Sequence, residues 1–173
     1  EGDMDGFMGK PHMEMEQIFD GERFPNVVVS TRGTVLATWG RDTFRVRRSE
    51  DGGENWGPEI EVADPGFHGG GVTVDEGNGA IIVFAEQEHP PGTPQGEMGP
   101  LRVFRSDDDG RNWERINVSI HPDSNGFVPA RHMAEHGITL RQGHHAGRLV
   151  RPARVYNKPG AEPRRYCSAI YSD

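Results

Sequence analysis

The sequence predicts an all-β protein built from short antiparallel strands, and two observations carry that prediction. Only 33% of the 173 residues are hydrophobic, whereas 24 are Gly and 13 are Pro, a composition that disfavours long helices and favours many turns. An eight-residue motif also occurs twice in full and begins a third time, so the chain is organised as repeats.

The motif occupies residues 49–56 and 106–113, and its third copy begins at residue 172; we call these copies the first, second and third box. Each follows a segment of β type, at residues 44–48, 101–105 and 168–171. The pattern predicts a hairpin turn. Its Asp accepts hydrogen bonds within the turn, its Gly takes a positive φ, and its Trp packs on the sheet. The residues given these structural roles are Ser49, Asp51, Gly53, Trp56, Ser106, Asp108, Gly110 and Trp113.

Further strands are predicted where apolar and β-branched residues lie between turn signals. Residues 27–39 read as a hairpin around a Thr-Arg-Gly turn. The other expected strands are at residues 14–19, 59–62, 71–75, 80–84 and 138–140.

The composition also excludes several classes of function. The formal net charge of −8 argues against a nucleic-acid partner, and no apolar run is long enough to cross a membrane. With Cys167 alone, an intrachain disulfide is ruled out. Residues 132–136 spell the inverted zinc-protease string, but Gly137 and a strand-like segment follow where that site needs a helix. We therefore expect no metal and no cofactor.

Three segments together resemble the sialidase family. The boxes resemble the Asp-box of sialidases and related β-propellers, with Asn55 and Asn112 where Thr is more usual. The tripeptide that begins at Arg23 is similar to the Arg-Ile-Pro signature that opens the sialidase domain. Residues 136–153 look like the sialidase segment H-G-I-Q-L followed by G-R-L-V-x-P-A.

The resemblance implies roles for four residues. Arg23 would be the first of three arginines that grip the substrate carboxylate, for which a planar guanidinium fork is suited. Asp42, which is the only acidic residue between the hairpin and the first box, would be the general acid/base. Arg41, counted with the substrate-binding residues, would orient Asp42 or pair with it. Tyr156 would contact the glycerol chain of the sugar. A strand-entry ion pair for Arg23, a turn-forming role for Asp42 and an ordinary half-exposed aromatic at Tyr156 remain open. The loop that carries Asp42 is also shorter than in most of the family.

The box spacing bears on architecture. Box starts lie 57 and 66 residues apart, which fits one four-stranded propeller blade per interval. The sialidase fold is a six-bladed β-propeller, so the resemblance implies that this chain forms about two and a half blades. We expect an N-terminal arm at residues 1–13 and the N-terminal part of the propeller at residues 14–173. The rest of the propeller is expected on a second polypeptide, divided from this one by self-cleavage or by proteolysis within the third box.

The function implied is that of a retaining exo-sialidase that removes terminal sialic acid, with its Tyr nucleophile on the complementary part. The alternatives are a catalytically inactive sialidase-like propeller that binds glycans or serves as a scaffold, and another propeller enzyme acting on acidic polysaccharide. The expected partners are a complementary C-terminal chain and a sialylated or other acidic glycan, with no nucleic acid and no membrane. The resemblance implies a secreted, periplasmic or cell-surface location.

Overall fold

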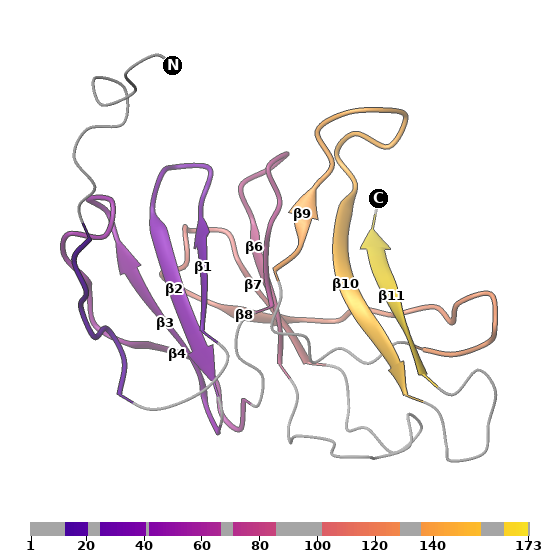
Figure 1. Cartoon of the computed structure of the whole chain (residues 1–173), viewed down its shortest axis with the longest axis horizontal. Coiled ribbons are helices and arrows are strands. Elements are labelled where there is room, and N and C mark those ends of the chain that lie inside the picture. Colours follow the sequence, from indigo (N-terminus) through magenta and orange to yellow (C-terminus); the bar gives the residue numbers. More distant parts are fainter. Residues whose placement is uncertain are drawn as a thin grey trace, which may run out of the picture.

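The structure, a computed structural model, describes residues 13–20, 25–40, 42–66, 71–85, 102–128, 136–156 and 165–172, without the side chains at positions 156 and 165. These residues form eleven strands in three antiparallel sheets (Figure 1). The described part of the chain contains no helix that is long and apolar enough to cross a membrane. The predicted all-β class is confirmed.

The first sheet is a four-stranded meander in which each strand pairs with the next one along the chain. Its strands are β1 (Asn26–Val29), β2 (Val35–Gly40), β3 (Phe44–Ser49) and β4 (Ile60–Ala63). The Ser30 amide donates to the Thr34 carbonyl over 2.9 Å and closes the β1–β2 turn, which confirms the predicted hairpin. The first box forms the β3–β4 connection.

The second sheet repeats this meander. Its strands are β5 (Val72–Val74), β6 (Ile81–Ala85), β7 (Arg102–Ser106) and β8 (Glu114–Ile116). The second box connects β7 to β8, so the interval between the first two box starts contains four strands, as the spacing predicts.

The third sheet has three described strands, in the order β11-β10-β9. They are β9 (Ile138–Thr139), β10 (Leu149–Tyr156) and β11 (Arg165–Ser172). β9 and β10 form a hairpin around a long turn that contains Gly and His residues, and the third box begins at the end of β11.

The three sheets share one register. In each sheet the Ser that begins the box pairs with the first residue of the neighbouring strand that precedes it in the chain. These pairs are Ser49 with Val35, Ser106 with Ile81, and Ser172 with Leu149. Residues of different sheets can therefore be matched position by position.

A hydrophobic core joins the first two sheets, because alternate residues of their strands face one another. In β3, Phe44 and Val46 are fully buried, while the alternate residues Arg45 and Arg47 are half-buried. Burying each such apolar side chain stabilises the fold by about 1.5–3 kcal/mol. The core residues are Leu36, Phe44, Val46, Val62, Ala63, Val72, Ile81, Val83, Ala85 and Phe104.

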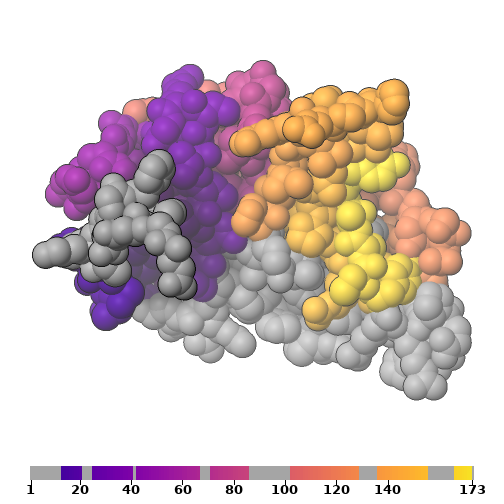
Figure 2. Space-filling view, turned by 45° about the horizontal axis from the view of Figure 1, so that its top comes forward, coloured from indigo at the N-terminus to yellow at the C-terminus, as the bar shows by residue number. Residues whose placement is uncertain are grey.

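The second and third sheets meet through β5 and β9. The Gly137 amide donates to the Val72 carbonyl over 3.1 Å, and the Thr139 hydroxyl donates to the Val74 carbonyl over 2.9 Å. β5 also contacts β1, so the first strands of the three sheets are neighbours. In the space-filling view the first and third sheets flank one face, with part of the second between them at the top (Figure 2).

The strand predicted at residues 14–19 is wrong, because this segment has no strand structure. Phe19, at the end of this segment, instead packs on the first sheet. The Phe19 ring meets the Trp39 ring edge to face, with centroids 5.6 Å apart, and the Arg47 guanidinium lies over Phe19 at 5.7 Å.

Candidate functional site

Antiparallel pairing gives the sheets two distinct ends. The first two boxes and the β1–β2 and β5–β6 turns lie at one end, which we call the box end. At the opposite end β1 begins, β2 leads into β3, and β10 finishes. Because Gly137 at the start of β9 lies beside Val72 at the start of β5, the ends of the second and third sheets correspond.

Asp42 lies at this opposite end, in the turn between β2 and β3. The strands on its two sides pair as far as Gly40 and Phe44, so the turn is tight. The Asp42 carbonyl accepts a 2.7 Å hydrogen bond from the Gly66 amide, and its side chain is exposed. The structure therefore presents a carboxylate at the end away from the boxes, on backbone that is fixed at one point.

Of the other three predicted site residues, the structure describes only the backbone of Tyr156. Arg23 and Arg41 lie outside the described residues. Tyr156 ends β10, where its Cα pairs with that of Arg165, and its side chain is not described. The strand ends next to these positions share the end that holds Asp42, but contact among the four residues stays a prediction.

The first box has the hydrogen bonds predicted for its turn. Asp51 accepts from the Ser49 hydroxyl at 2.7 Å, from the Asn55 amide at 2.9 Å and from the Asn55 side chain at 2.8 Å. Ser49 in turn accepts from the Gly53 amide at 2.8 Å, where φ is +103°. The hydrogen bonds from Ser49 and Asn55 lower the pKa of Asp51 to about 2.

The second box repeats this arrangement. Asp108 accepts from the Ser106 hydroxyl at 2.9 Å and from the Asn112 amide at 2.8 Å, and the Trp113 indole donates to the Gly110 carbonyl at 3.1 Å. Burial raises the pKa of Asp108, but the hydrogen bonds from Asn112 and Ser106 outweigh it and lower the pKa to about 2. Both carboxylates are thus held ionised by their own turns, as structural groups are.

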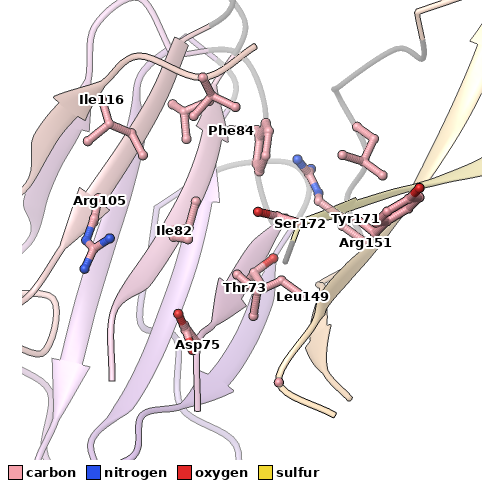
Figure 3. A pocket seen from close by; sticks show the side chains of 14 residues that line it. Thr73, Asp75, Ile82, Phe84, Arg105, Ile116, Leu149, Arg151, Tyr171 and Ser172 are labelled. Carbon is pink, nitrogen blue, oxygen red and sulfur yellow. The ribbon is translucent and has the colours of Figure 1, made fainter. Parts of the chain in front are cut away.

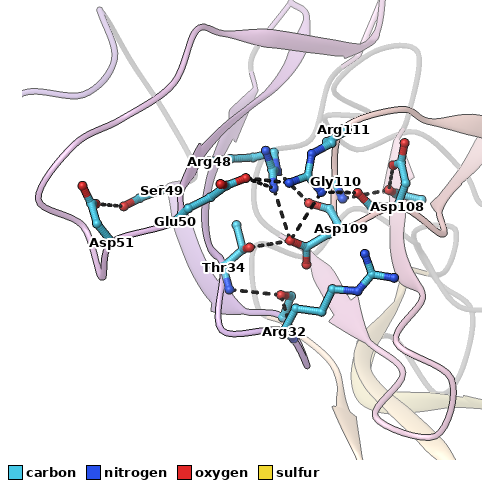
Figure 4. A network of polar contacts seen from close by, with 12 residues as sticks. Arg32, Thr34, Arg48, Ser49, Glu50, Asp51, Asp108, Asp109, Gly110 and Arg111 are labelled. Carbon is cyan, nitrogen blue, oxygen red and sulfur yellow. Dashed lines mark hydrogen bonds and ion pairs between the residues drawn. The ribbon is translucent and has the colours of Figure 1, made fainter.

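Sequence reasoning missed the most connected carboxylate, that of Asp109. It occupies the fourth position of the second box with φ of +67°, whereas Gly52 occupies that position in the first box. Its side chain is 4% exposed and reaches into the first sheet, where it accepts a hydrogen bond from the Thr34 hydroxyl (Figure 4). The non-glycine residue at a positive-φ position was the available signal.

Arg48 joins Asp109 to the first box. Its Nε donates to the Asp109 carbonyl at 2.7 Å, and its Nη2 lies 3.2 Å from the Asp109 carboxylate and 3.0 Å from Glu50. Arg111 also reaches Glu50, at 2.6 Å. Burial raises the pKa of Asp109, but hydrogen bonds from Ser30, Thr34 and Arg48 outweigh it and hold the pKa below its ordinary value. This network links the first two sheets.

A cavity of about 330 Å³ lies between the second and third sheets (Figure 3). Asp75 and Arg105 line its polar part, and Ile82, Phe84 and Leu149 are among its apolar walls. It does not include Asp42. Among the described residues no group of three His, Cys, Asp or Glu side chains is placed to hold a metal ion.

Comparison with known proteins finds a sialidase that is similar to most of this chain. Over 183 aligned residues the chain is 30% identical to a sialidase from Micromonospora viridifaciens, across 90% of this chain. By sequence, the chain resembles part of a sialidase. It spans 28% of the length of that relative. No profile of a known protein family matches it.

A solved sialidase structure is similar in fold to most of this chain. The Hadza microbial sialidase Hz136 has a TM-score of 0.62 and 24% sequence identity to this chain, and the match covers 87% of this chain and 35% of the other. A GH93 α-L-arabinofuranosidase of Fusarium graminearum has a TM-score of 0.42 and 14% identity, over 76% of this chain and 40% of the other.

Proposed function

We propose that this chain is part of a sialidase, a glycoside hydrolase that removes terminal sialic acid from glycans. The single observation that carries the proposal is the 30% identity to a sialidase over 90% of the chain. Because the chain spans only 28% of that relative, the activity belongs to the complete protein. On the same resemblance the complete protein acts outside the cytoplasm.

In this proposal the chain supplies the first part of a six-bladed propeller, and a complementary C-terminal polypeptide supplies the rest, including a Tyr nucleophile. Two four-stranded sheets and one of three described strands support a blade arrangement. So does the contact of the first strand of one sheet with the first strand of the next.

Arg23 binds the substrate carboxylate in this mechanism. A guanidinium offers two parallel N–H donors that match a carboxylate, and each hydrogen bond between charged groups contributes about 1.5–3 kcal/mol. Its place two residues before Pro25, where the first sheet begins at the end that holds Asp42, supports this role.

Asp42 acts as general acid, protonating the departing glycosidic oxygen, and then as general base toward water. Its exposed side chain in the β2–β3 turn supports this role, because an acid must reach the leaving group. Arg41 would orient the carboxylate, and Tyr156 would contact the far end of the sugar. The nucleophile of the retaining reaction would come from the complementary part.

A second function, glycan binding without turnover, is favoured by the tightness of the Asp42 turn. Pairing extends to Gly40 and Phe44, and the Asp42 carbonyl is fixed by the Gly66 amide. A carboxylate on so short a turn has less reach toward a sugar held at the centre of the sheets.

The test is hydrolysis of α-sialosides by the complete protein. Arg23→Ala should lower kcat/KM by about 10²–10⁴-fold, because two charge-assisted hydrogen bonds to the substrate carboxylate are lost. Asp42→Asn should lower it by about 10²–10⁴-fold on a sialyl-oligosaccharide, whose leaving alcohol needs a proton. The loss should be smaller on a fluorogenic aryl sialoside, whose leaving group departs without one.

Arg32→Ala and Glu54→Gln are matched controls at the box end and should leave turnover unchanged. Equal losses for Asp42→Asn on both substrates would contradict an acid role. Absence of hydrolysis by the unsubstituted protein at any pH, with retention on a sialoglycan column, would support the binding function instead.

A further inference from the structure

The second box is seated on the sheet that precedes its own. A methyl group added at Gly110 would overlap Leu36 of β2, and Asp109 is bound by Thr34 and Arg48. The turn of the second box therefore fills the space over the first sheet at the box end, and the seat consists of Ser30, Thr34, Leu36 and Arg48.

The shared register locates the equivalent seat on the second sheet. Leu36 follows Val35 and corresponds to Ile82, which follows Ile81. Arg48 precedes the first box and corresponds to Arg105, which precedes the second. Ile82 and Arg105 both line the cavity between the second and third sheets (Figure 3).

The turn residues correspond as well. The Ser30 amide donates to the Thr34 carbonyl, and in the second sheet the Asp75 amide donates to the Ala80 carbonyl. Asp75 therefore stands in the place of Ser30, and it lines the cavity too. Ser172, the first residue of the third box, lies on the cavity's other side.

We propose that this cavity is the seat of the third box, whose turn continues from Ser172 and packs on Ile82 and Arg105 as the second box packs on Leu36 and Arg48. The argument uses the repeat geometry alone and stands whether or not the proposed hydrolysis is found.

The seat on the second sheet should favour a residue other than Asp at the fourth position of the third box. On the first sheet the hydroxyls of Ser30 and Thr34 donate hydrogen bonds to the carboxylate of Asp109. On the second sheet the corresponding residues are Asp75 and Ala80, so the seat supplies its own carboxylate and lacks one hydroxyl. A second carboxylate there would be repelled by Asp75. The third box should therefore carry Asn or Gly at its fourth position, both of which tolerate the positive φ found at Asp109.

Thiol accessibility tests the seat in the complete protein. Ile82→Cys is compared in two versions, one with the third box intact and one with its turn replaced by a Gly/Ser segment of equal length. Site-resolved maleimide labelling at this position should be at least about 10-fold slower with the intact box, because the packed turn excludes reagent. Labelling of Arg32→Cys, at an exposed position in the β1–β2 turn, should be equal in both versions and serves as the control. Equal labelling rates at position 82 would overturn the proposal.

A charge test covers the case in which the Gly/Ser version does not fold. Asp at the fourth position of the third box, in place of Asn or Gly, should lower Tm by about 3–6 °C, and Asp75→Asn should restore most of the loss. Glu114→Gln, which removes an exposed carboxylate outside the seat, should restore nothing. An unchanged Tm, or equal restoration by both substitutions, would contradict the proposed contact.

Discussion

Asp109 is the residue through which the second box holds the first sheet. Its carboxylate is 4% exposed and contacts Thr34 and Arg48, so its removal leaves the 12% exposed Arg48 guanidinium without its buried partner. Asp109→Asn keeps a residue that tolerates positive φ and removes only the charge. It should lower the free energy of unfolding by about 2–4 kcal/mol in urea denaturation. Asp107→Asn, at a carboxylate 68% exposed in the same box, is the matched control and should cost less than about 1 kcal/mol.

The same residue predicts a pH dependence. The pKa of Asp109 is below its ordinary value in the folded protein, so the unfolded chain binds a proton more readily in acid. The stability that this group contributes is fully present above about pH 5 and is lost as the pH falls through its folded pKa. Between pH 5 and 3 the free energy of unfolding should fall less steeply in Asp109→Asn than in the natural sequence. It should still fall, because Asp51 and Asp108 also have lowered pKa values. Parallel curves would show that Asp109 does not contribute.

At the scale of the element, the two intact boxes have the same internal hydrogen bonds and different surroundings. Gly53 and Gly110 both have positive φ, of 103° and 80°. A Cβ at Gly53 would lie 3.8 Å from Trp56, an ordinary contact, whereas one at Gly110 would overlap Leu36. Both Ala substitutions carry the same backbone cost of about 1–2 kcal/mol. Gly110→Ala should cost about 1–3 kcal/mol more because of overpacking.

Urea denaturation of the two variants measures this difference directly. Leu36→Val should reduce the cost of Gly110→Ala and leave that of Gly53→Ala unchanged, since only the former meets this side chain. Equal costs for the two glycines would mean that the second box is not packed on the first sheet.

The elements differ in how far the sequence predicts them. β2, β3, β6 and β7 are predicted to within about two residues, because apolar residues and turn formers signal them locally. β8 has no such signal in Glu114–Ile116 and forms by pairing with β7. The strand predicted at residues 14–19 is wrong because Phe19 is used for packing on Trp39.

The same distinction applies to the sites. The place of Asp42 between two strands follows from the sequence, and so do the hydrogen bonds inside each box. The contact of Asp109 with Arg48 does not, because it joins residues 61 positions apart and depends on how the two sheets pack. Roles for Arg23, Arg41 and Tyr156 stay predictions.

At the scale of the whole molecule, apolar side chains remain on the free sides of the outer sheets. Val27 and Val29 of β1 are 59% and 57% exposed, and Tyr171 of β11 is 62% exposed. If a complementary segment completes the propeller, these side chains become buried. Residues 1–173 produced alone should therefore self-associate in sedimentation velocity, and co-production with the complementary segment should give a single species of 1:1 composition. A monodisperse monomer of residues 1–173 would count against a complementary partner.

Because the second box packs on the first sheet, the second sheet stabilises the box end of the sheet that precedes it. A substitution in the second box should therefore destabilise the sheet that precedes it along the chain. Asp109 belongs to the second sheet by its chain position, but the backbone that loosens with its loss is that of the β1–β2 turn. In a closed ring of sheets packed in this way, the first box would pack on the last sheet. Each sheet would then have its full set of contacts only when the ring is closed.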